Sequence, residues 1–303
     1  MWLFSRLTTC LGFILSGLIA TAVQAETIDA NSGDGFVALN RKIQCSLADS
    51  SPQVFEWSGF GYSRVPGEPD RKIFSLLGMN IRQWGQVEEP DKGIGYRLVS
   101  REIMLYLDPQ TGEILRTFDN PWTGEANEVI HVANDPVNQR PGFGINADGS
   151  EKAFTYRDVN GQYLINYEIP LFYKNAMGGD YQKYVGGSYH ATEIFDFNGD
   201  VAELLDASKP VAYPVISWVR LAPWLPWMEM NGRAGMLYFN AMGRKLENYE
   251  QLSEVIKAEI AQQYPDYTTP PPLDDPRRNE TSWTFMKKII DSRTEEAAAT
   301  PQH

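Results

Sequence analysis

Three Asn-Gly pairs constrain the fold of this chain more than any other feature: Asn160-Gly161, Asn198-Gly199 and Asn231-Gly232. Type I′ hairpin turns need positive φ at both central residues, and asparagine followed by glycine tolerates this best. The first pair would join strands at 154–159 and 162–169, the second would join strands at 193–197 and 200–204, and the third precedes a strand at 236–240. We therefore predict a mainly β (α+β) protein in which an antiparallel meander forms a barrel-like or strongly curved sheet.

Two helical patterns flank the predicted strands. Apolar residues between Phe36 and Leu47 are spaced like one face of a helix, and those between Leu252 and Ile260 form an amphipathic pattern that Pro265 ends. We expect both helices to pack on the sheet. A last short helix is predicted over 283–290.

The first 25 residues have the pattern of a secretory signal peptide. Arg6 precedes an apolar run over 11–23, and small residues suit cleavage near Ala25. The run is too short for a membrane span. We expect a periplasmic or secreted protein without membrane insertion, with residues 26–290 forming a single β-rich domain and 291–303 a disordered tail.

The charge balance argues against nucleic acid as a partner. The whole chain has 27 basic and 39 acidic residues. Removal of the leader takes away one charged residue, Arg6. This leaves 26 basic and 39 acidic residues, or a net charge of −13. Such a chain would be repelled by nucleic acid and by anionic lipid headgroups.

Side chains suited to metals and cofactors are scarce. The histidines are His131, His190 and the terminal His303, and Cys45 is the one cysteine after the leader. No phosphate-binding or dinucleotide fingerprint is present. We therefore expect no metal site and no cofactor, and we interpret Cys45 as a small buried hydrophobe in preference to a reactive thiol.

Polar side chains that could take part in chemistry are densest over residues 120–138. On a strand over 128–132, His131 would share a face with Val129 and Ala133. A neutral imidazole inside a barrel could act as a general base, whereas a hydrogen-bonded core histidine is the alternative. Asn134 is interpreted as a turn residue or as a group that steadies negative charge, a role that Tyr189 could share.

Aromatic side chains cluster around Arg220. Trp218 and Arg220 share a strand face, and Trp224 and Trp227 follow among prolines. Rigid aromatic rings of this kind suit the wall of an apolar cavity, and the arginine could stack on them or capture a carboxylate. The alternative is that the terminal helix packs on this surface.

Three functional hypotheses follow. The first is binding of a small hydrophobic or aromatic molecule, with these ligand-binding residues: Trp122, His131, Trp218, Arg220, Trp224 and Trp227. The second is a cofactor-independent lyase, isomerase or hydrolase that uses His131 as acid–base, with Asn134, Tyr189 or Arg220 as charge-stabilising groups. The third is a structural or interaction module. The oligomeric state stays open in all three.

Several stretches together resemble the DUF1838 family of exported bacterial proteins. They are the segments 120–138 and 218–230, then Gly243-Arg244-Lys245 and Tyr264-Pro265. The resemblance covers roughly Phe36 to Pro272. That family is functionally uncharacterised, so the resemblance implies no catalytic residues for this chain.

Overall fold

The computed structural model describes residues 26–174, 177–185, 187–230 and 232–299. The expected signal peptide, residues 1–25, and Asn231 of the third Asn-Gly pair lie outside the described residues. No helix in the described ranges combines the length and apolarity that crossing a membrane requires.

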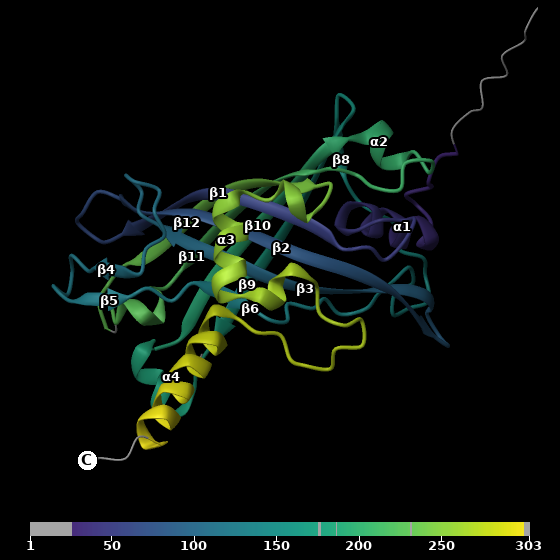
Figure 1. Cartoon of the computed structure of the whole chain (residues 1–303). Helices are drawn as coiled ribbons and strands as arrows, with labels where there is room; N and C mark the ends of the chain where they lie inside the picture. The colour runs from purple at the N-terminus through teal and green to yellow at the C-terminus, as the bar shows by residue number, and fades with distance from the viewer. Residues whose placement is uncertain (1–25, 175–176, 186, 231, 300–303) are drawn as a thin grey trace, which may run out of the picture.

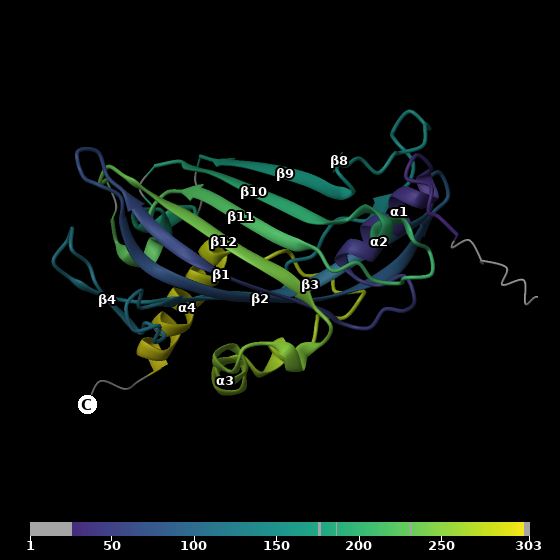
Figure 2. The same cartoon turned by 90° about the horizontal axis from the view of Figure 1, so that it is seen from above.

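A large antiparallel sheet dominates the described part (Figure 1). Its strand order is β6-β3-β2-β1-β12-β11-β10-β9-β8, with β7 paired to β3. A separate pair, β4 and β5, lies at one end of the sheet (Figure 2). The strand bounds are β1 (Gln53–Arg64), β2 (Arg71–Glu89), β3 (Gly93–Leu107), β4 (Thr117–Asp119), β5 (Ala126–Glu128), β6 (Val132–Asn134), β7 (Gly142–Phe143), β8 (Arg157–Val159), β9 (Gln162–Tyr173), β10 (Tyr189–Asp200), β11 (Val215–Ala222) and β12 (Met236–Leu246).

The mainly antiparallel β fold is confirmed, but the prediction of a barrel-like or strongly curved sheet is wrong. The sheet is neither closed nor strongly curled, and β6 and β8 lie at its two ends without pairing to each other. Each of these end strands has three residues. Closure needs a continuous ladder of hydrogen bonds around the whole circumference, which such short edge strands cannot supply.

The Asn160-Gly161 hairpin is confirmed. It joins β8 to β9, and both turn residues have positive φ, 53° and 81°. The third pair precedes β12, as expected for the strand at 236–240.

The hairpin predicted at Asn198-Gly199 is wrong. Both residues lie inside β10, and the expected second strand is a short helix, α2 (Val201–Leu205). The Asp200 side chain accepts a hydrogen bond from Glu203 N and so caps α2. Gly199 serves close packing, because a Cβ there would lie 2.5 Å from the Tyr163 hydroxyl oxygen.

Both predicted helices are present and pack on the sheet. The first, α1 (Gly33–Gln44), begins at the N-cap Ser32 and packs Leu39 and Ile43 against the β9–β10 end. The second, α3 (Glu254–Gln263), covers the opposite face of the sheet over β2 and β3 (Figure 2). Short 3₁₀ helices connect other segments: η1 (Gly179–Tyr184), η2 (Pro226–Met228), η3 (Tyr249–Gln251) and η4 (Pro265–Thr268).

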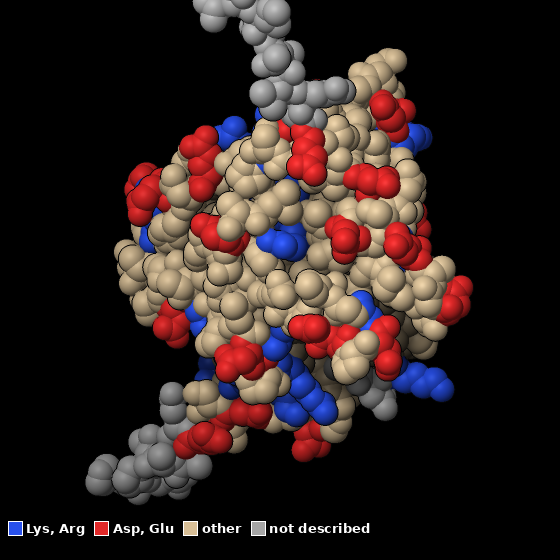
Figure 3. All heavy atoms as spheres, turned by 90° about the vertical axis from the view of Figure 1, so that its right-hand side faces the viewer, with Lys and Arg blue, Asp and Glu red and all other residues tan. Residues whose placement is uncertain are grey.

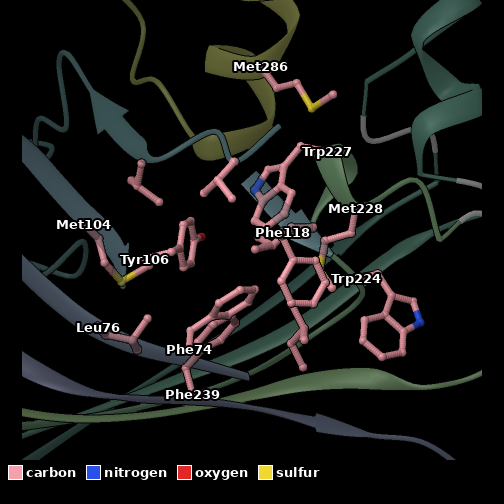
Figure 4. Packing of buried hydrophobic residues seen from close by; sticks show 14 of the residues in the cluster. Phe74, Leu76, Met104, Tyr106, Phe118, Trp224, Trp227, Met228, Phe239 and Met286 are labelled. Carbon is pink, nitrogen blue, oxygen red and sulfur yellow. The ribbon is translucent and has the colours of Figure 1, made fainter. Parts of the chain in front are cut away.

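The last helix is longer than the sequence pattern predicts. α4 spans Ser282–Ala299 and so continues through residues 291–299, which were assigned to the tail. Glutamate and alanine are strong helix formers, and this stretch is rich in both. Its N-terminal half packs on the sheet, with Met286 directed into the core cluster of Figure 4.

Charged side chains are mixed over the surface. Figure 3 shows acidic groups spread across the end of the molecule that carries α1, with basic groups between them. This distribution agrees with the net negative charge of the chain.

Candidate ligand cavity

A cavity of about 1360 Å³ lies over one face of the sheet. We call this side the cavity face, and α3 covers the other side. Directly paired residues of antiparallel strands point to the same side, so the cavity face can be followed from strand to strand. It carries Trp57 on β1, Arg82 on β2, Glu102 on β3, and Trp218 and Arg220 on β11.

Three elements cover parts of this face and leave the cavity between them. α1 lies at one end with Leu39 and Ile43 packed on it. The first turn of α4 lies at another side, where Trp283 contacts Tyr189 edge-on at 4.7 Å between ring centroids. Segments 132–139 and 154–157 contribute further lining residues. The opening is thus framed by chain segments far apart in the sequence.

Aromatic side chains line the floor of the cavity. Trp57 pairs with Gly78 on one side and with Gly243 on the other, and its indole occupies the space above Gly78. Trp218 stacks on Phe239 with 6.0 Å between centroids. The Nε1 atom of Trp218 is buried without a hydrogen-bond partner among the described residues. Such surfaces bind flat apolar groups well.

Arg82 is the cation at the α1 end of the cavity. Its Nε donates to Asn80 Oδ1 at 2.7 Å, and its Nη1 donates to Gln44 Oε1 of α1. The guanidinium lies 4.3 Å from the centroid of the Phe55 ring. Burial lowers the pKa of Arg82 to about 10, so it stays charged at neutral pH.

Glu102 faces the same cavity from the neighbouring strand. It pairs directly with Asn80, and Asn134 Nδ2 donates to its Oε1 at 3.3 Å. Burial raises the pKa of the Glu102 carboxyl to about 7, and the charge of Glu193 acts in the same direction. The positive charges of Arg82 and Arg220 oppose this rise. Glu102 is therefore a carboxyl that changes charge near neutral pH.

A second cluster of polar side chains lies on β10 and β11. Arg220 Nη2 donates to the Tyr189 hydroxyl at 2.7 Å, and Arg220 Nε lies 3.4 Å from Glu193 Oε1. Burial raises the pKa of Tyr189, so its phenol keeps its proton at neutral pH. Arg220 is thus already partnered by a carboxylate, whereas Arg82 is bonded to amide oxygens.

The structure places four of the predicted site residues in the cavity. Asn134, Tyr189, Trp218 and Arg220 all line it. Asn134 Oδ1 is buried without a partner among the described residues, although its Nδ2 is bonded to Glu102. The catalytic roles proposed for Asn134 and Tyr189 stay predictions.

His131 lies elsewhere. The strand expected over 128–132 is interrupted, and His131 directly precedes β6, where it does not line the cavity. Its Nδ1 accepts a hydrogen bond from Tyr106 N at 3.1 Å, so the neutral ring carries its proton on Nε2. Burial lowers the pKa of His131 to about 4, and the charge of Arg116 lowers it further. These features match the buried core histidine that was the alternative interpretation; its acid–base role stays a prediction.

The other predicted ligand-binding tryptophans also lie outside the cavity. Trp227 packs among Phe74, Tyr106 and Phe118 in the hydrophobic core shown in Figure 4. Trp224 contacts Trp122 at 4.9 Å between centroids in a neighbouring part of that cluster.

Sequence reasoning missed Trp57, Arg82 and Glu102. A signal for Arg82 and Glu102 was present, because polar residues recur with period two in otherwise apolar strands. Asn80 and Arg82 alternate with Met79 and Ile81 on β2, and Glu102 precedes an apolar run on β3. Alternating polar positions indicate a strand face that is not packed as a hydrophobic core.

Comparison with known sequences adds a family but no function. The profile of a family described as "Protein of unknown function (DUF1838)" matches residues 50–290. No curated protein matches the chain. Within the described residues, no cluster of histidine, cysteine and carboxylate side chains has the grouping that a metal ion needs.

Proposed function

The chain belongs to the DUF1838 family of unknown function, and we propose that it binds a small, largely apolar or aromatic molecule in the cavity. The observation that carries the proposal is the cavity of about 1360 Å³ with Trp57 and Trp218 on its floor. Ligand cavities are typically concave, mostly apolar and equipped with a few placed polar groups. Arg82, Glu102 and Arg220 would be those groups here.

The size of the cavity favours a ligand larger than a single aromatic ring. Cavities of roughly 300–1,000 Å³ hold drug-sized molecules. A space of about 1360 Å³ would therefore admit a fused aromatic or long aliphatic body together with some water. An exported location for this function also stays a proposal.

A neutral aromatic probe tests the proposal directly. Purified protein is titrated with N-phenyl-1-naphthylamine, whose fluorescence rises when it leaves water. We expect saturable binding, with one class of site. A linear, unsaturable rise would argue against a defined cavity site.

Two adjacent positions on β11 provide matched variants. Ile216 lines the cavity, whereas its neighbour Val215 is exposed on the other face of the sheet. Ile216→Trp should fill part of the cavity and weaken probe binding at least about tenfold. Val215→Trp should leave binding within about twofold of the original protein. Equal loss in both variants, or in neither, would show that the probe binds elsewhere.

A further inference from the structure

Arg82 is a cation enclosed by neutral partners. Its Nε and Nη1 donate to the amide oxygens of Asn80 and Gln44, and its Nη2 forms no hydrogen bond within the described part. No carboxylate among the described residues forms an ion pair with it. Charges removed from bulk water are normally compensated by an opposite charge close by. The cavity side of Arg82 is therefore suited to an anion.

The carboxyl nearest in the sheet register is only a partial counter-charge. Glu102 lies two residues along β3 from Ser100, which pairs with Arg82, and Asn134 Nδ2 donates to its Oε1. The charges of Arg82 and Glu102 act on each other, but they do not form an ion pair. An anion from outside could approach Arg82 only if Glu102 did not repel it.

The other ionisable groups around this site have contacts of their own. Glu193 on β10 lies beside Arg220 on β11. Burial raises the pKa values of the phenols of Tyr106 and Tyr189. On the same face of the sheet, the Lys245 ammonium lies over the Phe55 ring, as Arg82 does, and donates to backbone carbonyls at the end of α1. Burial lowers the pKa of Lys245 to about 7 and raises the pKa of Cys45 to about 11. Glu102, with a pKa raised by burial to about 7, is thus the carboxyl at this site whose charge changes near neutral pH.

Building on the binding function proposed above, we propose that the ligand is an amphipathic carboxylate whose binding is coupled to proton uptake by Glu102. The apolar body lies over Trp57 and Trp218, and the carboxylate pairs with the guanidinium of Arg82. The planar guanidinium matches the two oxygens of a carboxylate. The ligand binds as its anion, Glu102 takes one proton from solvent, and no covalent bond of the ligand changes.

The direction of the pH dependence follows from this coupling. Below about pH 7 Glu102 is neutral, and the anion meets Arg82 without repulsion. Above that pH Glu102 is negatively charged and repels the carboxylate of the ligand. The affinity of the ligand therefore falls by up to about tenfold per pH unit. A neutral ligand with the same apolar body should bind with nearly the same affinity at all these pH values.

Two matched fluorescent probes separate the inference from the proposed function. 1-Pyrenebutyrate carries a carboxylate that stays ionised between about pH 6 and pH 8, and 1-pyrenebutanol carries a hydroxyl in its place. We expect both to bind, and the ratio of their affinities to favour the butyrate about tenfold more at pH 6 than at pH 8. If both bind with a ratio that does not change with pH, the inference fails and the binding function stands. If neither binds, the proposed function fails as well.

Variants identify the groups responsible. Arg82→Gln should abolish the preference for the butyrate, Arg82→Lys should retain part of it, and Glu102→Gln should keep the preference but remove its pH dependence. A pH dependence that persists in Glu102→Gln would overturn the role of Glu102 and assign the effect to Lys245, whose pKa of about 7 lies in the same range. Arg64→Gln is the control, because Arg64 is exposed and paired with Asp70 outside the cavity. A butyrate preference that persists in Arg82→Gln would overturn the assignment. The probe comparison on the unaltered protein remains decisive if a variant does not fold.

Discussion

The indole of Trp57 lies against Gly78 of the neighbouring strand. A Cβ at position 78 would lie 2.3 Å from Trp57 Cε2, which is closer than real Cβ atoms approach a neighbour. The absence of a side chain at Gly78 thus allows the ring to lie over the cavity floor. This contact links a glycine in the middle of a strand to the shape of the candidate site.

Gly78→Ala should therefore move Trp57 and destabilise the fold. We expect the free energy of unfolding to fall by about 1–3 kcal/mol, and N-phenyl-1-naphthylamine to bind more weakly. Urea denaturation and probe titration measure the two effects. Gly85→Ala is the control, because the added Cβ there would meet the flexible end of Leu273 at 3.0 Å. Equal losses of stability in the two variants would contradict the role assigned to Trp57.

The buried His131 should make the protein less stable in mild acid. Its folded pKa of about 4 lies below the usual value of 6.5. Between these values the unfolded chain binds a proton that the folded protein does not, so stability falls as the pH drops from about 6.5 to 4, by up to about 1.4 kcal/mol per unit. His131→Asn, which retains an acceptor for Tyr106 N, should reduce this slope.

Urea denaturation at several pH values between about 4 and 7 measures the slope for each protein. His190→Gln is the control, because His190 is exposed at the rim of the sheet. The comparison between variants is needed because carboxylates also contribute to acid destabilisation. An unchanged slope in His131→Asn would show that His131 is protonated in the folded protein.

Lys245 should be essential to the attachment of α1. Its buried ammonium donates to the carbonyl oxygens of Lys42, Ile43 and Cys45 at the C-terminal end of the helix. Lys245→Met would leave these carbonyls without that donor, and we expect a loss of about 2–4 kcal/mol in the free energy of unfolding. Arg244→Met, at the exposed neighbouring position, should cost less than about 0.5 kcal/mol. Similar values for both variants would contradict this role.

The local patterns of the sequence predicted the secondary structure better than its arrangement. The spacing around Leu39 and Ile43 and the pair Asn160-Gly161 report on interactions between near neighbours, and both gave the observed elements. Gly199 has the same local signature as Gly161, but it makes room for Tyr163 from another strand. Only tertiary packing distinguishes the two glycines.

The location of the candidate site could not be predicted, because the sequence does not show which face of the sheet borders the cavity. Alternation places neighbouring residues of a strand on opposite sides, but it does not say which side borders a cavity. The pairing of Asn134 with Glu102 directs Asn134 to the cavity face, and Ala133 packs toward α3. His131 likewise lies where the charges of Arg116 and Glu259 act on it. The register between β3 and β6 thus decided which polar residues meet.

Trp218 should report ligand binding, because it lines the cavity and Trp84 does not. Energy transfer from tryptophan to bound N-phenyl-1-naphthylamine should fall more in Trp218→Phe than in Trp84→Phe, since transfer weakens steeply with distance. Loss of the larger ring should also weaken binding by about three- to tenfold. Trp84 stacks on Arg41 and donates to Asp49 O, so its replacement leaves the cavity unchanged. Equal energy transfer in the two variants would place the probe away from the Trp218 floor.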